Sequence, residues 1–254
     1  EISACLVGSE MCIRDRLAAV DAKNQIRKIA AEMLEANEGD LEFRHKKIFV
    51  RGSPEQSIGF RDAVRRCHYR QKGTIILGKA FYDPPTEEPD PMTGYGNKSA
   101  AYSFGVQVVV LKVDPETGKV SIQRVISAND VGRAINRMCS EGQFQGAIVQ
   151  GLGFATSEQL IWEKGETKNP NFMDYRIPRV NDIPEVELIL VETNDPEGPF
   201  GAKGIGEPGL VPTAPAIANA IYKAIGVRVK ELPITPEKIL DALKENKCKM
   251  RNKE

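Results

Sequence analysis

The stretch GPFGAKGIGEPGLVPTAPAIANAI, residues 198–221, holds a single carboxylate among residues that constrain the backbone. That carboxylate is Glu207, and Pro208, Pro212 and Pro215 follow it. Glycine permits backbone conformations and close approaches that other residues forbid. We therefore expect Glu207 to be presented rigidly. It is either a cap for the small-residue helix that follows or a group that transfers protons.

The same stretch matches a dinucleotide-binding pattern, because Gly204, Gly206 and Gly209 satisfy G-x-G-x-x-G. In such sites the glycines lie directly between a strand and its helix, so that a phosphate meets the helix N-terminus. Here the predicted strand ends near Glu192, and prolines delay the helix. An NAD-binding oxidoreductase is the weaker alternative, and a strand that runs directly into Gly204 would support it.

A second stretch, EGQFQGAIVQGLG at residues 141–153, combines a helical pattern with glycines and glutamines. Each glycine inside a helix costs up to ~1 kcal/mol relative to alanine, and close helix packing is one reason to accept that cost. Packing explains the glutamines Gln143, Gln145 and Gln150 less well. An amide offers both a donor and an acceptor, which suits a ligand that has both kinds of edge.

The amino-acid composition limits the classes of partner and of site that this chain can have. Lys plus Arg and Asp plus Glu each number 35, so no net charge favours nucleic acid or anionic lipid as a partner. No apolar run approaches the ~20 residues that cross a bilayer, so we expect no membrane span. The five cysteines are scattered without a CxxC pair, which indicates no metal or iron–sulfur site in this chain and fits a cytoplasmic protein. Since only two histidines are present, a carboxylate is the expected base.

The order of predicted elements indicates an α+β fold with helices and a mixed sheet. In the first part we expect a helix from Leu17 to about Asn37 that Gly39 terminates, a hairpin in LEFRHKKIFVRG, an N-capped helix that starts at Ser53, and a loop over residues 81–97. In the second part we expect strands at Ser103–Val113 and Val120–Ala128, a helix at 141–161, a strand in VELILVETN, a helix in PAIANAIYKAIG, a strand in VRVKELPI and a helix in PEKILDALKEN.

Residues 1–16 differ from the rest of the chain. CLVGSEMCIRDR is similar to a peptide that arises when sequencing-adapter DNA is translated by mistake. We therefore expect residues 1–16 to be non-native. Residues 17–254 would then be the C-terminal portion of a larger domain.

Four ordered segments together resemble one protein family. DVGRAINRMCSEGQFQGAIVQGLG, MDYRIPRVNDIPEVELILVE, GPFGAKGIGEPGLVPTAPAIANAI and LPITPEKIL are similar to the C-terminal region of the molybdenum subunits of the xanthine oxidase/aldehyde oxidase family. The resemblance extends, with gaps, from about Leu17 to Leu243.

This resemblance implies a cofactor, a reaction and partners. Family members bind molybdopterin, in bacteria often as the cytosine dinucleotide, and insert water-derived oxygen at a carbon of a small-molecule substrate or catalyse the reverse reduction. Their 2Fe–2S and FAD groups lie on other domains or subunits, so the resemblance implies a hetero-oligomer.

The family's catalytic glutamate, a general base, aligns with Glu207. The resemblance further implies cofactor contacts from the helix segment and from the glycine loop, namely Gln143, Gly146, Gln150, Gly151, Lys203, Gly204 and Gly206. It implies no direct metal ligand in this chain. A non-catalytic assembly domain stays open as an alternative, and it would bury Glu207 in a cap or an ion pair.

Overall fold

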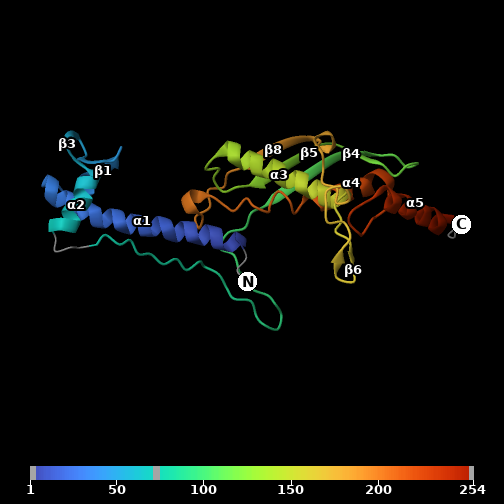
Figure 1. Cartoon of the computed structure of the whole chain (residues 1–254), viewed down its shortest axis with the longest axis horizontal. Helices are drawn as coiled ribbons and strands as arrows, with labels where there is room; N and C mark the ends of the chain where they lie inside the picture. The colour runs from blue at the N-terminus through green and yellow to red at the C-terminus, as the bar shows by residue number, and fades with distance from the viewer. Residues whose placement is uncertain (1–3, 71–74, 252–254) are drawn as a thin grey trace. The chain divides into compact units, whose positions relative to one another are not determined.

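The computed structural model describes residues 4–70 and 75–251 of the chain. These residues belong to two compact units, Glu1–Ser99 and Ala100–Glu254, which are described in turn (Figure 1).

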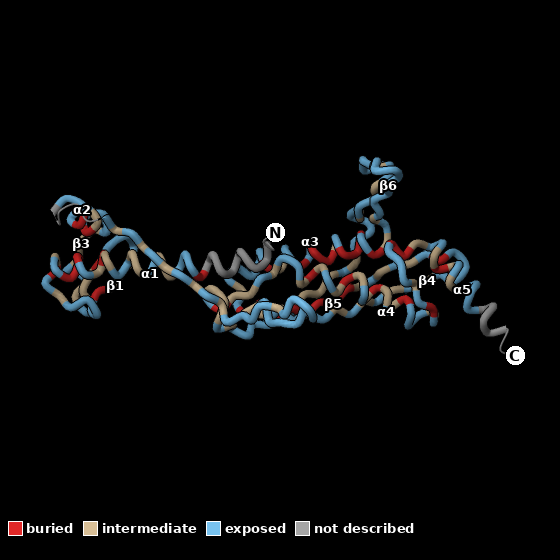
Figure 2. The backbone as a smooth tube through the Cα atoms, turned by 90° about the horizontal axis from the view of Figure 1, so that it is seen from below, coloured by how far each residue is buried: buried red, intermediate tan, exposed pale blue. Residues whose placement is uncertain are grey.

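The first unit is built on one long helix with a small sheet packed near its C-terminal end. The helix α1 spans Ala4–Leu34, and three antiparallel strands follow in the order β1 (Leu41–Arg44), β2 (Lys47–Val50) and β3 (Ser53–Gly59). The 3-10 turn η1 (Glu38–Asp40) precedes β1, and the helix α2 (Phe60–Arg70) follows β3. The core of this unit consists of Ile26, Ala30, Ala31, Leu34, Leu41, Ile48 and Ala63 (Figure 2).

The predicted helix and hairpin of this unit are confirmed, but three boundaries are wrong. The helix begins at Ala4 and not at Leu17. The helix ends at Leu34, where Glu35 takes a positive φ of 51°, so Gly39 is not its terminator. The predicted helix start at Ser53 is also wrong, because residues 53–59 form β3, whose Ile58 pairs with Ile48 of β2. As an edge strand, β3 tolerates Pro54, and the helix begins only at Phe60.

The second unit contains a mixed sheet of three strands, which confirms the α+β class. β4 (Gly105–Val113) pairs antiparallel with β5 (Val120–Asp130), and β5 pairs parallel with β8 (Glu185–Val191). The predicted loop over residues 81–97 of the first unit is likewise confirmed as neither helix nor strand.

Helices pack against this sheet and against one another (Figure 1). These are α3 (Arg137–Thr156), α4 (Thr213–Ile225) and α5 (Pro236–Arg251), with two 3-10 turns, η2 (Val180–Asp182) and η3 (Pro199–Gly201). Their shared core consists of Leu152, Ala155, Ile217, Ile221, Ile234 and Ile239. A short hairpin of β6 (Trp162–Glu163) and β7 (Glu166–Thr167) projects away from α3 (Figures 1 and 2).

Two predictions in this unit are wrong. The helix predicted over residues 141–161 ends at Thr156, and the β6–β7 hairpin follows it. The segment VRVKELPI forms no strand, and the N–H of Ile234 instead donates to the carbonyl of Ala155 at the end of α3 (2.7 Å). The apolar side chains of Val227 and Ile234 are buried, and Ile234 belongs to the core that the helices share. Among the described residues, no helix combines the length and the apolarity needed to cross a bilayer.

Candidate functional site

The glycine-rich segment forms an irregular loop, residues 202–209, which we call the Glu207 loop. It lies between η3 and α4 and contains neither helix nor strand. Side chains from outside the loop donate hydrogen bonds to its backbone carbonyls. Ser103 Oγ lies 2.9 Å from the carbonyl oxygen of Gly204, and Gln143 Nε2 lies 3.4 Å from that of Gly206. The loop is therefore attached both to the lead-in of β4 and to α3.

The C-terminal end of the Glu207 loop is packed tightly. Gln107 Nε2 donates to the carbonyl of Gly209 at 2.8 Å, and the Thr213 hydroxyl lies 3.0 Å from the same oxygen and 2.9 Å from Gln107 Oε1. A Cβ on Gly209 would lie 2.7 Å from Cδ1 of Phe144 and 3.0 Å from Cβ of Ala147, both buried on α3. Only glycine fits at this position without a displacement.

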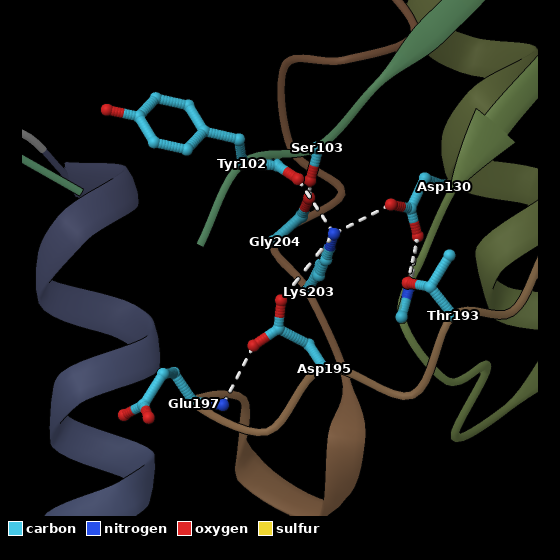
Figure 3. Close-up of polar contacts among 9 residues, drawn as sticks. Tyr102, Ser103, Asp130, Thr193, Asp195, Glu197, Lys203 and Gly204 are labelled. Atoms are coloured by element: carbon cyan, nitrogen blue, oxygen red, sulfur yellow. Dashed lines mark hydrogen bonds and ion pairs between the residues drawn. The ribbon is translucent and has the colours of Figure 1, made fainter. Parts of the chain in front are cut away.

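The N-terminal end of the loop is held by a buried ion-pair cluster around Lys203 (Figure 3). Its ammonium Nζ lies 2.6 Å from Oδ2 of Asp130, 3.5 Å from Oδ2 of Asp195 and 2.8 Å from the carbonyl oxygen of Tyr102. The three charged side chains are 8–11% exposed. An exposed aromatic ring, that of Phe104, lies 5.7 Å from the ammonium.

Asp130 has two further hydrogen bonds besides its contact with Lys203. Besides Lys203, it accepts hydrogen bonds at Oδ1 from the N–H of Gly132 (3.0 Å) and the hydroxyl of Thr193 (2.7 Å). Burial acts to raise the pKa of Asp130. The hydrogen bond from Lys203, the two others and the charge of Lys203 outweigh it and hold the pKa below its usual 3.8. The carboxylate is thus the stable form at neutral pH.

Glu207 itself is exposed, and its carbonyl accepts from the N–H groups of Leu210 and Val211. Within residues 4–70 and 75–251, no hydrogen bond or ion pair of its carboxylate is observed. The loop backbone is therefore fixed while the carboxylate stays available. The assembly-domain alternative required this group to be buried or paired, and in the described part of the chain it is neither.

The neighbouring face of α3 carries small and amide side chains. Gln143, Gly146 and Gln150 are exposed, and their spacing places them on one side of the helix, opposite the buried Phe144, Ile148 and Leu152. A Cβ added at Gly142 or Gly146 of α3, or at Gly204 or Gly206 of the loop, would meet no atom within 4 Å.

Two predicted site residues are used for packing within the chain. Gly151 is buried, and a Cβ there would lie 2.6 Å from Cβ of Thr213 and 3.1 Å from the carbonyl oxygen of Leu210. It allows α3 and the start of α4 to approach closely. The ammonium of Lys203 is likewise directed into the ion-pair cluster, as described above.

The structure also identifies site residues that the sequence analysis missed, namely Ser103, Gln107, Asp130, Asp195 and Thr213. One signal was available. Gln107 shares its strand face with Val109 and Leu111, which pack on the core, so a polar side chain in that row indicates a buried hydrogen-bond partner.

The dinucleotide alternative is contradicted by the topology. The strand β8 ends at Val191, the residues just before Gly204 are not a strand, and α4 begins only at Thr213. The three glycines thus do not form a strand-to-helix turn.

Comparisons with known proteins identify the family of the chain. The model of the molybdopterin cofactor-binding domain family matches residues 16–184. The chain is 36% identical over 242 residues to the 6-hydroxypseudooxynicotine dehydrogenase complex subunit gamma of Paenarthrobacter nicotinovorans, covering 94% of this chain and 29% of that protein. It is 31% identical over 230 residues to a putative xanthine dehydrogenase molybdenum-binding subunit of Escherichia coli K12, covering 89% of this chain and 29% of that protein.

A solved structure shares the fold as well. The CO dehydrogenase from Oligotropha carboxidovorans superposes with a TM-score of 0.71 at 26% identity, over 91% of this chain and 28% of that chain. The chain thus spans under a third of the length of these relatives. Because the family model covers most of the sequence, the chain belongs to the molybdopterin cofactor-binding domain family, in the group of molybdenum-binding subunits of the xanthine oxidase type.

Proposed function

We propose that this chain contributes the general base and part of the cofactor-binding surface of a molybdenum-dependent oxidoreductase that hydroxylates, or reductively dehydroxylates, a carbon of a small molecule. Glu207 is the proposed base. The observation that carries the proposal is a carboxylate with no hydrogen-bond or ion-pair partner among the described residues, on a loop whose carbonyls at Gly204, Gly206 and Gly209 are each bound by a side chain. A base must be held in place while its oxygens stay free to accept a proton.

The exposed surface beside Glu207 fits a large polar cofactor such as molybdopterin. The open positions at Gly146, Gly204 and Gly206 permit close approach, and the amides of Gln143 and Gln150 offer donors and acceptors to a pterin edge. In this proposal these residues contact the cofactor, while Gly151 and Lys203 shape the surface through the packing of α3 and of the loop. When bound, the cofactor supplies the redox centre and makes water-derived oxygen a nucleophile at neutral pH.

Within this site the chain's own task is proton handling and positioning. The carboxylate of Glu207 accepts the proton of the attacking oxygen, and the tethered loop keeps the carboxylate oriented through the reaction. The glutamine amides of α3 orient the cofactor by hydrogen bonds. In this proposal the loop backbone keeps its conformation during the reaction, because the carbonyls of Gly204, Gly206 and Gly209 are each already bound by a side chain.

The wider assembly is proposed on the same basis. The relatives include one subunit of a dehydrogenase complex and one molybdenum-binding subunit, which supports iron–sulfur and flavin partner subunits here as well. We propose a hetero-oligomer in the cytoplasm with the cytosine-dinucleotide form of the cofactor. The scattered cysteines support a reducing compartment.

The experiment that tests this function is the substitution Glu207→Gln in the cofactor-loaded holoenzyme. Loss of a general base typically lowers turnover by ~10²–10⁴-fold, and the isosteric amide keeps the loop intact. Molybdenum content and thermal stability are expected to stay at wild-type levels. Glu245→Gln, the same change at an exposed position of α5, is the matched control and is expected to be silent. Wild-type turnover in Glu207→Gln with full molybdenum content would refute the proposal.

A further inference from the structure

A feature outside the proposed chemistry is the charged cluster under the Glu207 loop, formed by Asp130, Lys203 and Asp195 (Figure 3). Side chains of opposite charge that are this well buried are uncommon and are paired when they occur. Lys203 lies four residues before Glu207, and the cluster joins segments that are far apart in sequence.

We propose that Lys203 is a positioning residue: its ammonium, bound by Asp130, Asp195 and the carbonyl of Tyr102, fixes the loop that presents Glu207, and it does not bind the cofactor. This inference rests on the proposed function of Glu207. It differs from the expectation that the Lys203 side chain contacts the cofactor directly.

The donors of the Lys203 ammonium are matched by acceptors within the chain. A lysine ammonium has three N–H donors, and three acceptors surround this one, at 2.6 Å, 2.8 Å and 3.5 Å. The side chain is 8% exposed, so water does not compensate for a lost partner. A contact with a cofactor would require at least one of these interactions to break.

The cluster connects the ends of two strands to the turn before η3 and to the Glu207 loop. Asp130 ends β5 and also accepts from Thr193, which follows β8. Asp195 accepts from the N–H of Glu197 at 2.8 Å, which fixes the turn before η3. The backbone N–H of Lys203 donates to the carbonyl of Val131 at 2.9 Å, so main chain and side chain of the same residue are both anchored at the end of the sheet.

At the cluster the backbone segments approach too closely for an alternative arrangement. Gly132 has a positive φ of 65°, and a Cβ on it would lie 2.3 Å from the carbonyl oxygen of Gly201 and 2.9 Å from the N atom of Lys203. The segments that carry the two partners of the main ion pair are thus in direct contact. Because the loop is anchored in this way, the end of the sheet determines where Glu207 lies.

The test uses the holoenzyme with Lys203→Met and Lys203→Arg. We expect Lys203→Met to lower kcat by roughly 10²-fold, the cost of a displacement of about 1 Å in a catalytic group, with little change in KM. The molybdenum content is expected to stay at the wild-type level. Hydrogen exchange at the amides of residues 203–210 is expected to become at least roughly tenfold faster, because local opening becomes easier. Lys203→Arg keeps the charge and is expected to restore part of both effects.

Two further variants keep the inference testable if Lys203→Met does not fold. Asp195→Asn removes only the 3.5 Å ion pair with Lys203. It is expected to change kcat and loop exchange in the same direction as Lys203→Met, but less. Lys203→Met alone leaves the carboxylate of Asp130 buried and unpaired. The double variant Asp130→Asn/Lys203→Met removes that carboxylate, so it is expected to be more stable than Lys203→Met but not to recover kcat.

Two outcomes would overturn the inference. These are unchanged loop exchange in Lys203→Met, with or without loss of molybdenum, and faster loop exchange with wild-type kcat. Failure of the proposed function is recognised separately, since it appears as wild-type turnover in Glu207→Gln while Lys203→Met still shows faster loop exchange.

Discussion

Gly209→Ala is the substitution whose effect follows most directly from the geometry. The added Cβ would lie 2.7 Å from Cδ1 of Phe144, whereas carbon atoms in contact prefer about 3.5–4.0 Å, so the loop must move by roughly 1 Å. Phe144 is fully buried and cannot yield easily. Overpacking of this kind costs about 1–3 kcal/mol, which corresponds to a decrease in Tm of roughly 2–12 °C for a chain of this size. Because Glu207 lies two residues away, kcat is expected to fall by up to ~10²-fold.

Gly206→Ala is the matched control in the same loop. A Cβ at Gly206 meets no atom within 4 Å, so we expect the unfolding free energy to stay the same or to increase by about 0.4–1 kcal/mol. Thermal and urea denaturation of both variants measure the difference, and steady-state kinetics of the holoenzymes measure kcat. Equal Tm values for Gly209→Ala and Gly206→Ala would refute the claim that contact with Phe144 requires glycine at 209.

The other predictions concern the anchors of the loop. The pKa of Asp130 is lowered on folding, so its contribution to stability is complete above the unfolded value of about 3.9 and is lost as pH falls through the lower folded value. Urea denaturation from pH 6 to pH 3 should therefore show a steeper acid-induced loss of stability for the wild type than for Asp130→Asn, and equal slopes would contradict this assignment. Gln107→Leu removes one of the two donors to the carbonyl of Gly209 and should lower the unfolding free energy by about 0.5–1.5 kcal/mol, while Gln145→Leu on the exposed face of α3 should not. Equal losses in the two glutamine variants would argue against the Gln107 anchor.

The sequence predicted most elements of the fold because their hydrophobic patterns are strong. The helix of α1, the β1–β2 hairpin, the β4–β5 pair and the helices α3, α4 and α5 were all expected near their observed positions. The errors are at places where tertiary contacts override local signals. SPEQSIG looks like a capped helix start but pairs with β2, and VRVKELPI looks like a strand but forms none, while Ile234 packs in the core that the helices share.

The sequence also contained two kinds of glycine that pattern alone cannot separate. Gly151 and Gly209 are required by contacts inside the chain, with less than 3 Å between an added Cβ and the nearest atom. Gly146 and Gly206 have open space. A glycine that no contact in the described residues requires still costs stability, which supports a role in ligand approach for this second kind.

What the sequence could not predict is how the loop is held, because each anchor joins distant parts of the chain. Ser103 and Gly204 are separated by 101 positions, Gln107 and Gly209 by 102, and Asp130 and Lys203 by 73. No local pattern contains such pairs, since they form only when β4 and β5 bring their ends to the loop. The same arrangement implies that the proposed base depends on strand residues that touch neither cofactor nor substrate. Substitutions at Ser103 or Gln107 should thus alter turnover through the orientation of Glu207, and their effects should not add to that of Glu207→Gln, because a base that is absent cannot be misplaced.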